Sequence, residues 1–242
     1  MMARMRFSPM VCARARRFWR RSGLWPGILG LGILALAPAA LAAEKVPVPG
    51  GYSDAMAWYR RAAEAGNPRG QYFLGLIHWR GLQGRKDPKR AADWFEKAAR
   101  QGHTAAQFGL GLAFQTGSGR TKDPAQAAQW FTLAARSGHV EAAYNLGVLY
   151  ERGMGVEKNP AQAAILFKQA AQAGLAPAQY NLGLLYGEGE GVPKDGVRAW
   201  RWLDRARQGG YAPARAALKS LERAMSKAER MKARKTRGKP ST

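Results

Sequence analysis

A 36-residue repeat constrains the fold of this chain more than any other feature of its sequence. Four segments align without a gap: Pro68–His103, Thr104–His139, Val140–Leu175 and Ala176–Tyr211. Glycine recurs at fixed places in every segment, at Gly75, Gly111, Gly147 and Gly183, then at Gly81, Gly117, Gly153 and Gly189, and again at Gly102, Gly138, Gly174 and Gly210. A fixed period of this length is typical of a solenoid, in which each repeat is one supersecondary unit stacked on its neighbours.

The first half of each repeat predicts a helix that packs closely against another helix. In the third repeat, residues Tyr144–Tyr150 place aromatic and aliphatic side chains on adjoining turns, with Gly147 between them. Glycine within a helix costs about 1 kcal/mol relative to alanine. Because all four repeats keep a glycine at this place, we expect it to let the second helix approach closely.

The second half of each repeat predicts a helix with a capped start. The cap is Asp87, Asp123 or Asn159 followed by proline, or Asp195 followed by Gly196. The cap side chain accepts hydrogen bonds from amides that would otherwise be unpaired, and proline at the first helical position has no amide to satisfy. The recurring acidic residues are therefore interpreted as helix caps and not as catalytic acids.

One face of this second helix is apolar. In the first repeat the 3-4 spacing comprises Ala91, Trp94, Phe95, Ala98 and Ala99. Trp130 is the equivalent of Trp94 in the second repeat, so it is predicted to be buried between adjacent repeats.

The combined pattern resembles the Sel-one-like repeat family, a slightly longer relative of the tetratricopeptide repeat. The fourth repeat carries the clearest first half, from Ala178 through Leu182-Gly183 to Tyr186, followed by Gly189, Gly191, Val192 and Asp195. The resemblance covers residues 54–211. It implies an all-α fold, a right-handed α-α superhelical solenoid of helix-turn-helix repeats, that acts as a scaffold for protein partners.

The chain departs from the family pattern in two respects. In the first repeat, Gly84 falls one place late and His78 replaces an aromatic residue. Some members of the family are stapled by disulfides, but the one cysteine of this chain, Cys12, lies in the amino-terminal segment. That branch of the family is therefore excluded.

The segments outside the four repeats complete the expected organisation. We predict a signal peptide or uncleaved anchor at 1–43, a linker at 44–53, a partial repeat with only its second helix at 54–67, repeats at 68–103, 104–139, 140–175 and 176–211, a capping helix at 212–233 and a basic disordered tail at 234–242.

The first 43 residues have the order of an export signal. Seven arginines precede the apolar core Leu24–Leu36, and the segment has no acidic residue. After the core, Ala40-Leu41-Ala42 has the form that signal peptidase accepts. Cleavage near Ala42 or Ala43 predicts a periplasmic or secreted protein. The alternative is an uncleaved inner-membrane anchor with the rest facing the periplasm, since the apolar stretch is close to the roughly 20 residues that span a bilayer.

The charge of the chain is strongly positive, with 39 Lys and Arg against 16 Asp and Glu. The excess is concentrated at the two ends, and the tail 234–242 either contacts an anionic surface or remains a solvated end. Nucleic acid is not expected as a partner of an exported chain.

The sequence suggests no catalytic residue, cofactor site or metal site. His103 and His139 occupy a place that Leu175 and Tyr211 also fill, so we interpret them as packing residues. His78 stands at an aromatic position and is interpreted in the same way. We therefore expect a protein that is not an enzyme.

Candidate partner-binding residues were sought where the repeats differ from one another. Near the end of the first helix these are Trp79, Arg80, Gln115, Glu151, Arg152 and Glu188. In related tetratricopeptide units such places line the concave face, and an exposed Trp beside Arg is typical of an interface hot spot. Ordinary drift of surface residues is the competing explanation.

The function expected from these patterns is an exported scaffold for protein–protein interactions in the bacterial cell envelope. One alternative is a cell-envelope enzyme acting on peptidoglycan or β-lactams, which needs a carboxylate pair or an activated nucleophile that the sequence does not suggest. The other alternative is a cytoplasmic adaptor, if the amino terminus is not an export signal.

Overall fold

The computed structural model describes residues 52–82 and 84–235, and within these ranges every regular element is an α-helix. The helices are α1 (Tyr52–Glu64), α2 (Pro68–Arg80), α3 (Pro88–Arg100), α4 (Thr104–Thr116), α5 (Pro124–Arg136), α6 (Val140–Arg152), α7 (Pro160–Gln172), α8 (Ala176–Glu188), α9 (Gly196–Gln208), α10 (Pro213–Ala224) and α11 (Lys227–Lys235). The all-α repeat fold predicted from the sequence is confirmed.

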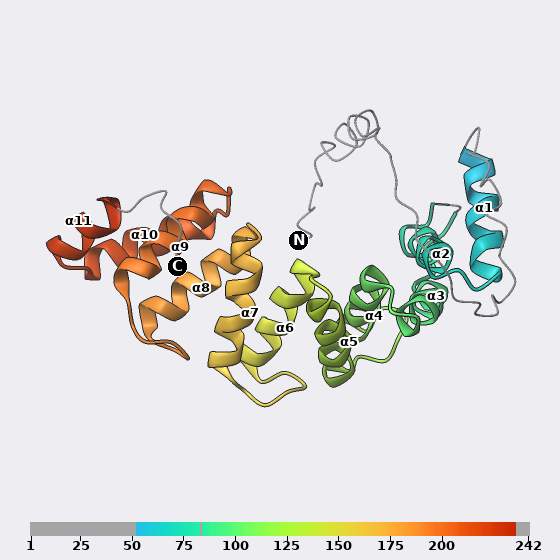
Figure 1. The fold of residues 1–242 in the computed structure, drawn as a ribbon, viewed down its shortest axis with the longest axis horizontal. Helices are drawn as coiled ribbons and strands as arrows, with labels where there is room; N and C mark the ends of the chain where they lie inside the picture. The colour runs from blue at the N-terminus through green and yellow to red at the C-terminus, as the bar shows by residue number, and fades with distance from the viewer. Residues whose placement is uncertain (1–51, 83, 236–242) are drawn as a thin grey trace, which may run out of the picture. The chain divides into compact units, whose positions relative to one another are not determined.

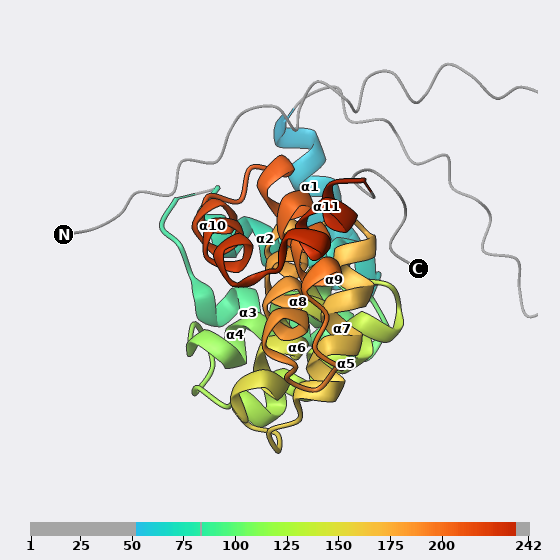
Figure 2. The same ribbon diagram turned by 90° about the vertical axis from the view of Figure 1, so that its left-hand side faces the viewer.

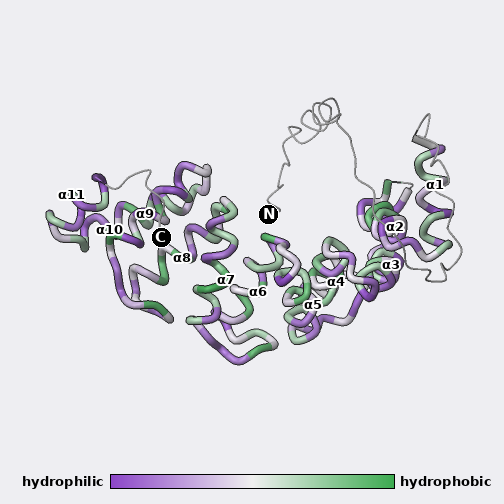
Figure 3. The backbone as a smooth tube through the Cα atoms, in the orientation of Figure 1, coloured by the Kyte–Doolittle hydropathy of each residue, from purple (hydrophilic) through white to green (hydrophobic). Residues whose placement is uncertain are grey.

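The helices pack in the order in which they occur along the chain (Figure 1). The first helix of each repeat, such as α4, packs against the second helix of its own repeat, α5, and against that of the preceding repeat, α3. The turned view has α10 and α11 toward the viewer, at the carboxyl end of the stack (Figure 2). Hydrophobic and hydrophilic residues alternate along the helices (Figure 3), because each helix must offer an apolar side to two neighbours.

The second helices begin at the predicted caps. Oδ1 of Asp87 accepts a hydrogen bond from the backbone N–H of Arg90 at 2.9 Å, and Oδ1 of Asp195 accepts one from Arg198 at 2.8 Å. Asp123 and Asn159 cap α5 and α7 in the same way. The cap interpretation of these side chains is therefore confirmed.

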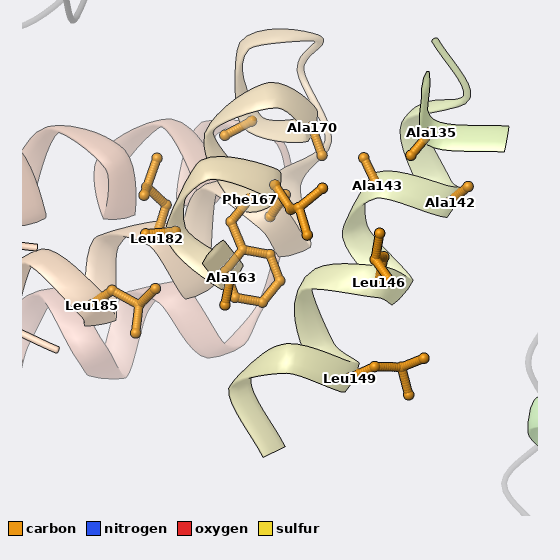
Figure 4. Packing of buried hydrophobic residues seen from close by; sticks show 14 of the residues in the cluster. Ala135, Ala142, Ala143, Leu146, Leu149, Ala163, Phe167, Ala170, Leu182 and Leu185 are labelled. Atoms are coloured by element: carbon orange, nitrogen blue, oxygen red, sulfur yellow. The ribbon is translucent and has the colours of Figure 1, made fainter. Parts of the chain in front are cut away.

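The conserved place of glycine in the first helix is a contact with an aromatic ring. A Cβ atom on Gly111 would lie 2.6 Å from Cε1 of Phe131, and one on Gly147 would lie 2.7 Å from Cε1 of Phe167. Phe167 is fully buried and lies among small and branched residues of neighbouring helices (Figure 4). The predicted close approach of the two helices is confirmed. The side chain that the glycine admits is phenylalanine in the first three repeats and Leu203 in the fourth.

The burial expected for Trp130 is wrong. Its side chain is half-buried and packs at the edge of the core, whereas its neighbour Phe131 is 0% exposed. Successive residues of a helix point about 100° apart, so only one of the two can face the glycine of the first helix. Trp202 of the fourth repeat, at 2% exposure, is buried as expected.

The carboxyl-terminal cap consists of two helices where the sequence analysis expected one. Met225 has an extended backbone, with ψ of 144°, and ends α10. Ser226 and Glu229 then form a reciprocal capping box, in which Oε2 of Glu229 accepts from the Ser226 N–H at 2.8 Å and Oγ of Ser226 accepts from the Glu229 N–H at 3.2 Å. This box starts the separate helix α11, which includes Arg234 and Lys235 of the expected tail.

Several expectations fall outside the described residues. These are the signal peptide, the linker up to residue 51 and the tail from residue 236 onward. Within 52–82 and 84–235, no helix is both long and apolar enough to cross a membrane.

Candidate functional site

The candidate site is the partly exposed side of the first helices, which we call the first-helix face. It is defined by four positions that recur in α2, α4, α6 and α8, and its residues are Tyr72, Phe108, Tyr144 and Tyr180, then Leu76, Leu112, Val148 and Leu184, then Trp79, Gln115, Glu151 and Gly187, and finally Arg80, Thr116, Arg152 and Glu188. All sixteen residues are half-buried or exposed. They lie on the helices but outside the fully buried core, so part of their surface reaches solvent.

Aromatic side chains on this face link each repeat to the start of the next. The ring of Tyr72 stacks on that of His103 with centroids 4.7 Å apart, and Phe108 stacks on His139 at 4.3 Å. Tyr180 contacts Tyr211 in the same relation at 5.1 Å. The predicted packing role of the two histidines is therefore confirmed.

The histidines have a second role that the sequence analysis missed. Nδ1 of His103 accepts the backbone N–H of Ala106 at 3.3 Å, and Nδ1 of His139 accepts that of Ala142 at 3.3 Å, so both rings cap the helix that follows. Asn67 caps α2 at the equivalent place. The sequence did indicate this role, because His103 and His139 stand at the place of Asn67 in the repeat and asparagine is a preferred helix cap.

Burial favours the neutral form of both rings. Desolvation lowers the pKa of His103, and the nearby Arg69 guanidinium lowers it further. Desolvation also lowers the pKa of His139, against the opposing charge of Glu141, whose Oε2 lies 3.3 Å from Nδ1. A neutral ring that accepts the Ala142 N–H at Nδ1 cannot also donate from that atom, so we assign the capping role and not an ion pair.

The predicted pair Trp79 and Arg80 lies at the end of α2. Trp79 is half-buried and packs against Phe95 with ring centroids 6.2 Å apart, so the expectation of an exposed Trp is wrong. Arg80 is exposed, and its charge partly offsets the effect of burial, which raises the pKa of Tyr72. The repeat framework thus uses the tryptophan ring for packing and leaves the arginine free to meet a partner.

Glu151, Arg152 and Glu188 are brought close together at the ends of α6 and α8. Burial raises the pKa of Glu151, and the carboxylates of Glu190 and Glu188 raise it further, against the opposing charges of Arg152 and Lys158. Carboxylates from two repeats therefore share one region of the first-helix face. Gln115, half-buried on α4, belongs to the repeat between this region and the Trp79–Arg80 pair.

Sequence reasoning overlooked the half-buried apolar residues of the first-helix face. The sequence predicts only that Tyr72, Leu76 and their equivalents belong to a packed helix, because periodicity alone does not separate a residue in the core from one at its rim. Groups of three or more His, Cys, Asp or Glu side chains that could hold a metal ion do not occur in the described part of the chain.

Comparisons with known proteins agree with this geometry. The Sel1 repeat model matches residues 46–67, 68–103, 104–139, 140–175 and 176–211. A Sel1 repeat protein from Oxalobacter formigenes is 34% identical, with a TM-score of 0.64 over 69% of this chain and 69% of that one. A protective antigen of uropathogenic Escherichia coli strains, which displays an SLR fold, is 37% identical with a TM-score of 0.63.

The two matched structures differ in how much of their own length this chain covers. The E. coli match covers 66% of this chain but 34% of that protein, so this chain spans about a third of its length. Among curated proteins, none matches the chain. Because the matched Sel1 repeats span well over half of its sequence, the protein belongs to the Sel1 repeat family.

Proposed function

We propose that this protein is an exported scaffold of the bacterial cell envelope, which holds protein partners on its first-helix face. The observation that carries the proposal is that some positions keep their residue from repeat to repeat while others change. Core positions keep the same kind of residue in all four units, with Phe95, Phe131, Phe167 and Leu203 at one such place, whereas the last two places of the first helix change from Trp-Arg to Gln-Thr, Glu-Arg and Gly-Glu. A Sel1 repeat scaffold is suited to protein–protein interaction, and these changing residues are the ones free to select a partner.

The charges along the face support the same function. Arg80 lies at the first repeat, Glu151 and Arg152 lie together at the third, and Glu188 lies at the fourth. A partner segment with acidic residues at one end and basic residues at the other would complement this arrangement, and complementary charge contributes chiefly to specificity and association rate.

Export is the part of the proposal that the amino-terminal sequence supports. The arginine-rich start, the apolar core Leu24–Leu36 and Ala40-Leu41-Ala42 favour cleavage. We expect the mature protein to begin near Ala43 or Glu44 and to be recovered outside the cytoplasm. Amino-terminal sequencing after cell fractionation tests this, and an intact Met1 on a soluble cytoplasmic species would refute it.

Site-specific crosslinking tests the binding face. A photo-crosslinking residue at Arg80 or Arg152 should capture defined envelope proteins in living cells. The same residue at Lys168, on the exposed side of a second helix, should not. Trp79 is left unchanged because it packs against Phe95, so replacing it would also disturb the core. Equal capture from Lys168 would show that the first-helix face is not the binding surface.

A further inference from the structure

An open groove lies between α8 and α10, beside the carboxyl end of the first-helix face. Its volume is about 570 Å³. Tyr180, Leu184, Leu203 and Leu221 line it with apolar surface, and Glu188 lines it as well. Tyr180, Leu184 and Leu221 are only partly buried, so the groove exposes apolar surface to solvent.

The groove exists because two large side chains are missing. Helix α10 continues the 36-residue register, with Pro213, Ala214 and Leu218 at the places of Pro177, Ala178 and Leu182. At the places of Tyr180 and Leu184, however, it carries Ala216 and Ser220. All four complete repeats have a large aromatic and a branched aliphatic residue there, so the absence of these two side chains from α10 leaves part of the groove open.

The same register shows why the helix that follows α10 in the described residues does not pack as another repeat would. Lys219 stands at the place of Gly183, where every complete repeat needs a glycine for the close approach of its second helix. Helix α11 instead packs against α9. The tail 236–242 supplies two basic residues but no large apolar one, so it does not match the lining.

Charge indicates the chemistry of the occupant. The three places along α8 follow one another by one helical turn: Tyr180, then Leu184, then Glu188. Burial raises the pKa of the nearby Glu151, and the carboxylates of Glu190 and Glu188 raise it further against the opposing charges of Arg152 and Lys158, so three carboxylates lie in this region. On a chain with a formal charge of +23, this end of the groove is a local exception that favours a cation.

We propose that the α8–α10 groove binds a segment of a protein partner that carries two large apolar side chains one helical turn apart and a Lys or Arg one turn beyond them. The apolar pair takes the places left by Ala216 and Ser220, and the cation meets Glu188. This inference rests on the proposed scaffold function and names the kind of segment that the scaffold holds at this end.

Peptide binding to the purified full-length chain tests the proposal. The probes are two labelled, alanine-rich helical peptides with Phe, Leu and Lys at positions i, i+4 and i+8, one in each chain direction, and binding is followed by fluorescence anisotropy. We expect one direction to bind. Binding should be lost when Phe and Leu are replaced by Ala, and weakened about fivefold when Lys is replaced by Glu. The variant Glu188→Lys should then prefer the Glu peptide.

A filled groove provides the decisive variant. Ala216→Tyr with Ser220→Leu restores the residues that α8 carries, and both native side chains are exposed, so the variant is expected to fold, which circular dichroism verifies. Its affinity for the peptide should fall about tenfold or more, as for the loss of a large buried apolar contact. The matched control Gln129→Tyr with Gln172→Leu, at exposed sites on α5 and α7, should bind like the wild type.

The outcomes separate this inference from the scaffold proposal. Failure of both peptides to bind, equal affinity of the filled variant, or indifference to the Glu188 exchange would each overturn the groove assignment. If the groove assignment is overturned while crosslinks persist at Arg80 and Arg152, the scaffold proposal stands. Peptide binding in the groove without any crosslinked envelope protein would instead support the groove and refute the scaffold role.

Discussion

Gly111→Ala offers the sharpest test of how the two helices of a repeat fit together. A Cβ at this position would lie 2.6 Å from Cε1 and 2.7 Å from Cδ1 of Phe131. Ordinary contact between carbon atoms is about 3.5–4.0 Å, so the ring would have to move by about 1 Å. Phe131 is 0% exposed, and side chains in a protein core are packed closely enough to resist such a shift.

Two opposing effects determine how much Gly111→Ala changes the free energy of unfolding. Alanine is favoured over glycine within a helix by about 1 kcal/mol. Overpacking a core costs about 1–3 kcal/mol. Because the ring is fully buried, we expect overpacking to prevail and the free energy of unfolding to fall by up to about 2 kcal/mol.

A double-mutant cycle with Phe131→Ala measures this contact directly. Phe131→Ala alone should cost about 3–5 kcal/mol, as large-to-small changes in a core do. In that background the clash is gone, so Gly111→Ala should become neutral or stabilising. Urea unfolding followed by circular dichroism gives the four free energies, and the coupling is their departure from additivity.

The control is a glycine with room for a side chain. A Cβ on Gly187 would have its nearest neighbour, Cβ of Ala199, at 3.7 Å, which is ordinary contact. Gly187→Ala should therefore leave stability unchanged or raise it by up to about 1 kcal/mol. If Gly111→Ala stabilises the protein, or if its effect adds to that of Phe131→Ala, the ring contact is not the reason for the glycine.

Three further predictions concern the pH dependence of stability, the burial of Trp130 and the role of the tail. Folding lowers the pKa of His103 and His139, so the unfolded chain binds more protons than the folded protein as pH falls below about 6.5. The stabilising contribution of the two neutral rings is therefore complete above that pH. It should be lost as pH falls through the lowered pKa values of the folded protein. Replacing both residues by Asn, the cap that Asn67 provides, should reduce this decline in the free energy of unfolding measured between pH 5 and 8; an unchanged slope would contradict it. Trp130→Ala should destabilise the protein less than Phe131→Ala in the same urea assay, because the Trp130 side chain is only half-buried. An equal loss of stability would support the prediction that Trp130 is buried between adjacent repeats. Removal of residues 234–242 should reduce only salt-sensitive binding, since exposed charges are screened beyond about 10 Å in 0.1 M salt; loss of partner capture at high salt would place the main contact in the tail.

The architecture of the protein can be predicted from its sequence. The 36-residue period, the Asp-Pro starts and the recurring glycines are local or periodic signals, and each corresponds to one feature of the repeat. Helix starts depend on hydrogen bonds between residues two or three apart, as at Asp87 and Arg90, so they can be read without knowing what packs nearby. The capping box of Ser226 and Glu229 is also a local signal of this kind, although the sequence analysis predicted one capping helix over 212–233.

The tertiary structure decided which residues face the core and which face a partner. Trp130 and Phe131 are adjacent and both apolar, and only the position of Gly111 on another helix selects the phenylalanine. Trp79 looked exposed in a comparison of repeats, yet the ring of Phe95 from the next helix covers part of it. The groove between α8 and α10 likewise depends on Ala216 and Ser220 standing opposite the wall formed by α8. Burial is a property of pairs of helices, and a repeat pattern in one chain gives the positions of residues along each helix but not the neighbour that each side chain meets.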